Sequence, residues 1–121
     1  MPENLIEAED PSFLSALTDD TVLESSFLSR PLVGRKAIGR LVRYTSKIYG
    51  SKNEPIVLSA DGTVIAQYHA TLRDGFPVYC VVVLTYNADG EIVSVRSGYS
   101  PFEASKRIAD EVRDQILEFE A

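Results

Sequence analysis

The sequence is poor in three things that particular functions require: cysteine, basic charge and long hydrophobic runs. Its single cysteine, Cys80, excludes an internal disulfide bond and a zinc site built from cysteines. Lysine and arginine number 12 against 18 acidic residues, and the net charge of −6 argues against nucleic acid, whose phosphates require clustered positive charge. No signal peptide or transmembrane run is recognisable, so we expect a cytoplasmic location and no membrane association.

Histidine is equally scarce, and this scarcity limits the chemistry that the chain can perform. His69 is the only histidine. No His/Asp/Glu cluster suggests a metal site, and we expect no cofactor. The basic residues between Arg30 and Lys52 are interpreted as a solvated helix face, with an anion-binding patch as the alternative.

Four strand-like segments dominate the second half of the chain, and turn sequences separate them. They are rich in Val, Ile, Tyr and Thr, and they span Ile56–Ala60, Thr63–Leu72, Phe76–Tyr86 and Glu91–Tyr99. Asp-Gly pairs lie between them, and Asp-Gly between apolar segments is a strong hairpin signal because glycine readily adopts positive φ. The pattern predicts an antiparallel meander within one domain that spans residues 1–121.

Helices are predicted before and after this meander in the sequence. Asp10-Pro11 suits the start of a short helix that ends near Leu17, and Val22–Ser26 suits a short edge strand. The segment 34–49 has the apolar spacing of an amphipathic helix, and Gly50 would stop it. Ser100-Pro101 followed by Glu103 predicts the start of a C-terminal helix. Its apolar stripe fits against its own domain or against a partner.

The turn lengths predict which side chains share a face of the sheet. A two-residue turn at Asp74-Gly75 would pair His69 with Cys80, and the loop at 87–90 would pair Val82 with Val95. A slip of one residue would move a strand's side chains to the opposite face. The face that we expect to form a pocket then carries Gln67, His69, Thr71, Cys80, Val82, Val95, Ser97 and Tyr99.

Both predicted faces are substantially apolar, which is unusual for a sheet with one solvated side. Helices of one small domain can cover one face, and a second subunit would cover the other. We therefore expect a homodimer through the convex face, with partial cover by the C-terminal helix as the alternative. Arg96 falls on that face, where an ion pair at the dimer interface is the favoured role.

The order of these segments resembles the nuclear transport factor 2-like superfamily, nearest to its SnoaL-like polyketide cyclase and ketosteroid isomerase branches. The resemblance covers residues 10–102 and is carried by Leu17–Asp20, Leu32–Ile38 and Asp89–Pro101. It implies a cystatin-like α+β cone, in which a curved antiparallel sheet of four to five strands wraps two or three helices around an apolar pocket.

The resemblance also indicates which chemistry is missing. The position of the proton-shuttling carboxylate of ketosteroid isomerases is similar to Ser25, and that of their protonated aspartate is similar to Val82. The long first helix that carries their tyrosine has only Pro2–Glu9 to match it, so ketosteroid isomerisation is not expected. Polyketide cyclases pair a histidine with an aspartate. His69 matches the histidine, whereas Val82 again replaces the aspartate.

Two main functions remain for the predicted pocket. The first is an enzyme in which His69 acts as base or polariser on a small apolar carbonyl compound, because imidazole titrates near neutrality. Glu24, near the expected pocket mouth, is a further candidate. The second is a module without catalysis that binds a small hydrophobic molecule or another protein in the same cone. A weaker third reading is an assembly domain whose C-terminal helix binds a partner.

Overall fold

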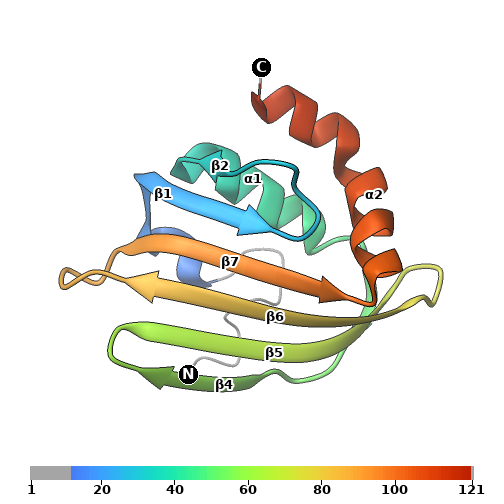
Figure 1. The fold of residues 1–121 in the computed structure, drawn as a ribbon, viewed down its shortest axis with the longest axis horizontal. Helices are drawn as coiled ribbons and strands as arrows, with labels where there is room; N and C mark the ends of the chain where they lie inside the picture. Colours follow the sequence, from blue (N-terminus) through green and yellow to red (C-terminus); the bar gives the residue numbers. More distant parts are fainter. Residues whose placement is uncertain (1–11, 121) are drawn as a thin grey trace.

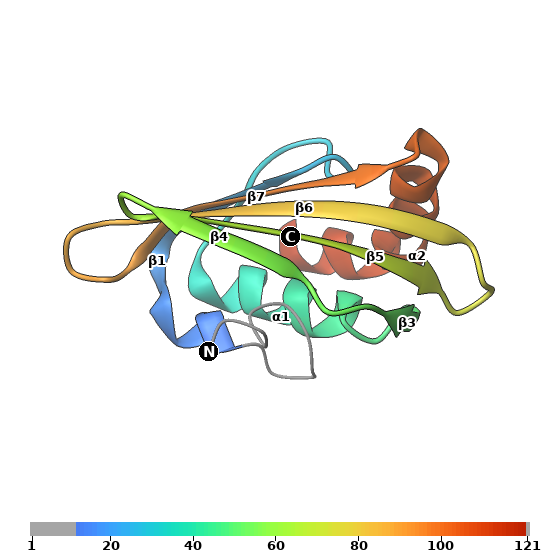
Figure 2. The ribbon, with the colours of Figure 1, turned by 90° about the horizontal axis from the view of Figure 1, so that it is seen from below.

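A curved sheet with helices on one side forms the protein (Figures 1 and 2). The computed structural model describes residues 12–120, and side chains over residues 13–113. The elements in this part are η2 (Ser12–Ala16, a 3-10 helix), β1 (Leu17–Ser25), β2 (Leu32–Val33), α1 (Arg35–Thr45), β3 (Tyr49–Lys52), β4 (Ile56–Ala60), β5 (Thr63–Leu72), β6 (Pro77–Tyr86), β7 (Ile92–Ser100) and α2 (Phe102–Glu120). The predicted α+β cone is confirmed.

The sheet is larger and more mixed than predicted. Its seven strands within residues 12–120 follow the order β2-β1-β7-β6-β5-β3, and β4 also pairs with β5. Strands β4 to β7 form the predicted antiparallel meander, whereas β1 pairs in parallel with β7. The expected number of four to five strands, all antiparallel, was therefore too small. Strand β1 also runs longer than the predicted Val22–Ser26, and it is not an edge strand because β2 pairs with it on the other side.

The register between β5 and β6 differs from the prediction by one residue. The Leu72 N–H donates to the Phe76 carbonyl at 2.9 Å, so three residues rather than two form the loop. Gly75 has φ 91° there, a conformation that glycine tolerates far better than other residues. His69 therefore pairs with Tyr79, and Tyr68 pairs with Cys80.

This slip exchanges the faces of β5. We call the helix-covered face of the sheet the inner face and the opposite one the outer face. Tyr68, Ala70 and Leu72 are buried on the inner face, in place of the predicted Gln67, His69 and Thr71. The β6–β7 register also differs, since Val82 pairs with Ser97, but a shift of two residues preserves the face of each side chain.

The first half of the chain departs from the prediction at two places. The predicted helix over 34–49 ends at Thr45, because Tyr49–Lys52 instead pairs with β5 as strand β3. Gly50 lies within this strand, where an added Cβ would be 2.9 Å from the Leu72 carbonyl oxygen. The predicted helix start at Asp10-Pro11 lies outside the described residues.

Helix α2 docks on its own domain. Ala104, Ile108 and Val112 are all at most 1% exposed. The Arg107 guanidinium lies 4.1 Å from the centre of the Phe76 ring, and its Nη1 donates to Asp74 Oδ2 at 2.7 Å. The described part of the predicted apolar stripe is therefore used within the chain.

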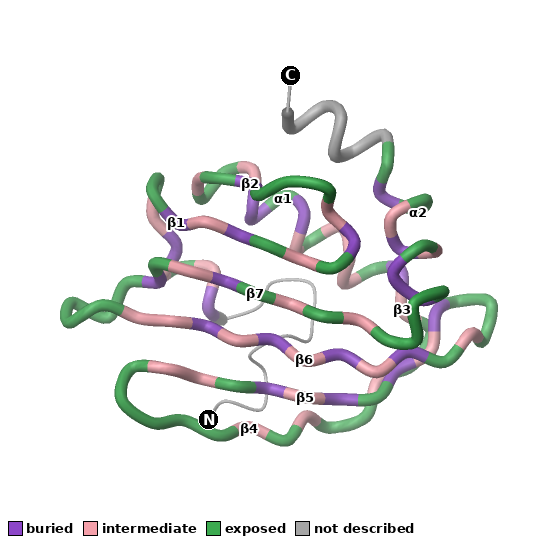
Figure 3. The backbone as a smooth tube through the Cα atoms, viewed as in Figure 1, coloured by how far each residue is buried: buried purple, intermediate pink, exposed green. Residues whose placement is uncertain are grey.

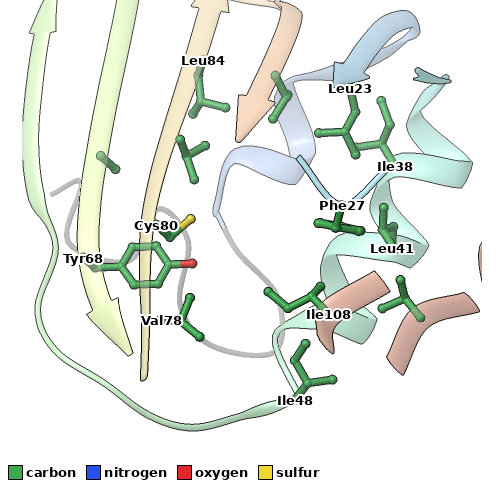
Figure 4. Packing of buried hydrophobic residues seen from close by; sticks show 14 of the residues in the cluster. Leu23, Phe27, Ile38, Leu41, Ile48, Tyr68, Val78, Cys80, Leu84 and Ile108 are labelled. Atoms are coloured by element: carbon green, nitrogen blue, oxygen red, sulfur yellow. The ribbon is translucent and has the colours of Figure 1, made fainter. Parts of the chain in front are cut away.

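Buried side chains gather between the helices and the inner face. Burial alternates along β5, β6 and β7, as expected for strands with one covered face (Figure 3). Tyr68 and Leu84 extend from the sheet toward Ile38 and Leu41 of α1, with Ile108 of α2 below them (Figure 4). None of the described helices has the length and apolar character needed to cross a lipid bilayer.

Candidate functional site

A small cavity lies between α1 and the inner face of the sheet. Its volume is about 60 Å³. Five of its described lining residues are aromatic: Phe13, Phe27, Tyr49, Tyr68 and Tyr99. The other described lining residues are Leu23, Leu41, Val42, Thr45, Ser46, Val82, Val95 and Ser97. The cavity is thus an apolar, aromatic-walled space with hydroxyl groups in its wall, far smaller than the several hundred Å³ typical of sites for drug-sized ligands.

Three tyrosines of the wall and the buried Cys80 form a cluster of polar side chains at the site. The hydroxyl oxygens of Tyr49 and Tyr68 lie 3.1 Å apart, and their rings meet edge to face at 6.1 Å between centroids. Burial raises the pKa of Tyr49 to about 12, and it raises that of Tyr68 well above the ordinary value. Both hydroxyls therefore remain protonated at neutral pH and can donate hydrogen bonds.

Tyr99 and Cys80 complete this tyrosine cluster. Burial raises the pKa of Tyr99 well above its ordinary value, and the nearby Cys80 and Tyr49 raise it further. Burial also raises the pKa of the Cys80 thiol to about 11, although hydrogen bonds with Tyr68 and Tyr99 partly offset this effect. A thiol with such a pKa is not an activated nucleophile.

The position of Tyr99 is fixed by a network of serines. The Tyr99 N–H donates to Ser26 Oγ at 2.9 Å, and Ser105 Oγ donates to the Tyr99 carbonyl at 3.0 Å. The two serine oxygens are themselves 2.8 Å apart. The Tyr99 ring meets Phe27 edge to face at 5.6 Å. This part of the wall is therefore held on two sides, by hydrogen bonds to the backbone and by ring packing.

Four of the predicted ligand-contacting residues line this cavity: Val82, Val95, Ser97 and Tyr99. Cys80 is fully buried on the inner face beside them. The corrected register brings these residues together because each of the β6 and β7 positions keeps its predicted face.

The remaining predicted site residues lie on the outer face. Gln67, His69 and Thr71 pair with β6 residues that point away from the helices, so their assignment to the pocket face was wrong. His69 is exposed, with its ring 4.8 Å from that of Tyr79. An acid–base role for His69 in the cavity has no support from this geometry.

Glu24 also lies on the outer face, where it is paired within the chain. Its Oε1 is 3.0 Å from Arg96 Nε, and both side chains are at least half exposed. Arg96 is on the predicted face, but its ion pair is with a residue of the same chain. Glu24 is therefore a surface residue and not a group at the mouth of the cavity.

Sequence reasoning missed Tyr49 and Tyr68, the two tyrosines that pair at the centre of the cluster. Tyr68 carried a signal: a three-residue loop at 73–75 would have put it on the inner face. The sequence signal for Tyr49 was weaker, because its position after the preceding apolar residues fitted the end of a helix as well as the start of a strand.

The chemistry of the site is that of hydrogen-bond donation in a largely apolar space. Its described lining residues include no carboxylate, imidazole or amine that could take a proton. The described residues also contain no group of three His, Cys, Asp or Glu arranged to hold a metal ion.

Comparison with known proteins identifies the fold through structure alone. No protein-family model and no curated protein matches the sequence. A protein with a cystatin-like fold from Silicibacter pomeroyi matches with a TM-score of 0.78 and 10% identity over 87% of this chain and 74% of that one. Two proteins described as NTF2-like, from Burkholderia xenovorans and Mesorhizobium loti, also match. The chain has the nuclear transport factor 2-like fold.

Proteins with this fold that match the chain carry different descriptions. A steroid delta-isomerase from Pseudomonas aeruginosa matches with a TM-score of 0.72 and 13% identity over 88% of this chain and 78% of that one. A hypothetical protein with a ketosteroid isomerase-like fold from Catenulispora acidiphila, in complex with trimethylamine, matches with a TM-score of 0.55 and 15% identity over 80% of this chain and 82% of that one. At such low identity these matches show the nuclear transport factor 2-like fold and no activity.

Proposed function

We propose that the protein binds a small, mostly apolar molecule in its cavity and holds one hydrogen-bond acceptor of that molecule through the tyrosine cluster. The observation that carries this proposal is the meeting of three protonated tyrosines in a cavity whose described lining offers no base. A ligand carbonyl would accept from these hydroxyls, while the aromatic and aliphatic walls would contact its hydrocarbon part.

Binding without catalysis is favoured over the enzyme that the sequence also suggested. Proton abstraction from a carbon beside a carbonyl requires a base within hydrogen-bond reach, and the described wall supplies hydroxyl groups but no base. The structural match to a steroid delta-isomerase supports an enzyme as the alternative. In that alternative, tyrosine hydroxyls would polarise the carbonyl, and the base would come from outside the described wall.

Cyclohexanone is a suitable first probe, because it combines a small ring with one carbonyl oxygen. We expect titration to move the backbone amide resonances of Tyr68, Val82 and Tyr99 in two-dimensional NMR spectra. Tyr68→Phe should weaken binding about two- to tenfold, the usual effect of losing one hydrogen bond. Tyr79→Phe is the matched control, since the Tyr79 hydroxyl donates to Gln67 on the outer face and should leave affinity unchanged.

Three outcomes would contradict the proposal: no shift with cyclohexanone, equal affinity in Tyr68→Phe, or a preference for trimethylammonium. Trimethylammonium is included because aromatic walls also suit methylated cations, and because the Catenulispora acidiphila protein is described with trimethylamine. Exchange of the ketone's α-protons in D₂O, followed by NMR, separates the two readings. Exchange above the uncatalysed rate would establish an enzyme instead of a binding module. The homodimer predicted from the sequence is a separate proposal, because it depends on residues of the opposite face.

A further inference from the structure

An open cleft lies between α2 and the loop that joins β5 to β6, which we call the α2 cleft (Figure 1). Its volume is about 430 Å³, within the range of roughly 300–1,000 Å³ that is typical of sites for small molecules. Two apolar and five charged residues make up its described lining. None of them lines the cavity that contains the tyrosine cluster, so the α2 cleft is a separate candidate site.

Hydrogen bonds hold the walls of the α2 cleft in place. On the loop side, the Arg73 N–H donates to the Ile48 carbonyl at 3.1 Å, and the Phe76 N–H donates to Asp74 Oδ1 at 3.0 Å. Arg107 joins the two walls, because its Nη1 donates to Asp74 Oδ2 at 2.7 Å while its guanidinium lies over the Phe76 ring. The cleft is therefore largely formed before a ligand enters, which lowers the entropic cost of binding.

Two charged side chains of the α2 cleft are not paired within the described part of the chain. Asp110 has a partner outside the cleft, since its Oδ1 accepts from Arg113 Nη2 at 2.6 Å. The Arg73 guanidinium and the Glu111 carboxylate, in contrast, have no ion pair or hydrogen bond with any residue that the structure describes. Both side chains are exposed. The cleft therefore offers a ligand one positive and one negative group.

This balance of charge selects the class of ligand. An anion would approach three carboxylates of the cleft, and a cation would approach two guanidinium groups. A neutral molecule would take Arg73 and Glu111 out of water without pairing with either, which is unfavourable. A zwitterion avoids these costs, because its carboxylate can form two parallel hydrogen bonds with an arginine while its ammonium group pairs with a glutamate. The apolar part of the lining, Ile48 and Leu72, suits a hydrocarbon side chain on the same ligand.

We propose that the α2 cleft binds a free α-amino acid with an apolar side chain. Its carboxylate would bind Arg73, its ammonium group would bind Glu111, and its side chain would contact Ile48 and Leu72. Arginine and glutamate have long side chains, so these two can reach a pair of charges that a single carbon atom carries. The proposal does not depend on the function proposed for the tyrosine cluster, because the two sites have no described lining residue in common.

L-Leucine is the probe that tests this site, and two analogues separate its charges. Of these, 4-methylpentanoate lacks the ammonium group and 3-methylbutylamine lacks the carboxylate. We expect leucine to move the backbone amide resonances of Arg73, Asp74 and Glu111 in two-dimensional NMR spectra, with a Kd of about 1 mM because the charged groups stay partly hydrated. Each analogue should bind about fivefold more weakly, since it loses one charge pair.

Single substitutions assign the two charges to residues. Arg73→Gln and Glu111→Gln should each weaken leucine binding about three- to tenfold, the effect of losing one partly exposed charged hydrogen bond. Lys36→Gln and Glu54→Gln are the matched controls, because each removes one charge of the same sign at an exposed position outside the cleft. Both controls should leave the affinity for leucine unchanged.

Each of four other results would overturn the proposal. The first is no movement of the cleft resonances at about 50 mM leucine, far above the expected Kd. The second is an analogue that binds as tightly as leucine, which would indicate a site for a simple anion or cation. The third is an equal loss of affinity in the control variants, and the fourth is movement of the Tyr68, Val82 and Tyr99 resonances in place of those of the cleft. Far-ultraviolet circular dichroism of each variant verifies that the fold is retained.

Discussion

At the scale of single residues, the site owes its character to neutral donors. Tyr49, Tyr68, Tyr99 and Cys80 are all held in their protonated forms by burial. A cluster of this kind can orient a ligand oxygen, but it cannot accept a proton. The sequence favoured His69 as a site residue because imidazole can exchange protons near neutral pH. The tyrosines belong to the site because the strands place them in the cavity wall.

Alkaline pH should destabilise the protein through this cluster. Cys80 has an ordinary pKa of 9.0 and a folded-state pKa of about 11, so the unfolded chain loses its proton first. Stability is therefore full below pH 9 and is lost as pH rises toward 11, by about 2–3 kcal/mol for a shift of this size. Tyr49, whose pKa rises from 10.0 to about 12, should add to the loss above pH 10.

Urea unfolding at pH 8, 9.5 and 10.5 measures this effect. Cys80→Ala serves as the comparison, since it should be less stable at pH 8 yet lose less stability between pH 8 and 10.5. An equal loss in both proteins would show that Cys80 does not cause the dependence.

The sequence predicted the correct face of the sheet for a residue wherever the error in the strand register was an even number of residues. Val82, Val95, Ser97 and Tyr99 kept their face because the β6–β7 register changed by an even number of residues. His69 lost its face because the β5–β6 register changed by one. Which side chains meet in the cavity therefore depended on a loop length, and Asp-Gly suits loops of two or three residues.

At the scale of elements, the loop between β5 and β6 sets the composition of the core. Three residues in this loop bring Tyr68, Ala70 and Leu72 inward. A two-residue loop would bring Gln67, His69 and Thr71 inward instead, and three buried apolar side chains would be exchanged for polar ones. The hydrophobic effect therefore selects the longer loop.

A pair of glycine substitutions tests how strongly the loop specifies this register. Gly75 has φ 91°, and nothing lies within 4 Å of an added Cβ. Gly98, in β7, has equally open space but no positive φ. We expect Gly75→Ala to cost about 1–2 kcal/mol of unfolding free energy through backbone strain alone. Gly98→Ala should change it by no more than ~0.5 kcal/mol. Equal effects in urea titrations would contradict the assignment of strain to this loop.

At the scale of the whole molecule, the family resemblance implied the cone, but the sequence did not show which strands pair beyond the meander. The meander and the C-terminal helix have long periodic patterns, and these patterns decide structure reliably. Strands β2 and β3 are only two and four residues long, too short to show a period. The parallel pairing of β1 with β7 joins distant segments, and no local pattern encodes such a partner.

That parallel pairing has a kinetic consequence. Ser25 and Ser97, which pair across it, are 72 residues apart, whereas the hairpins of β4 to β7 join neighbours in the sequence. Closing a long loop costs chain entropy before contacts repay it, so we expect the hairpins to form first and β1 to join late. In stopped-flow experiments, Leu23→Ala should mainly speed unfolding, whereas Val82→Ala should mainly slow folding.

The reverse pattern of rates would contradict this order. If the order holds, the cavity is the last part of the molecule to form, because β1 supplies Leu23 to its wall and leads directly to Phe27. A chain caught before this step would have its hairpins and an incomplete cone. Ligand binding would then report completion of folding, and a ligand would prolong the life of the native state chiefly by slowing the departure of β1.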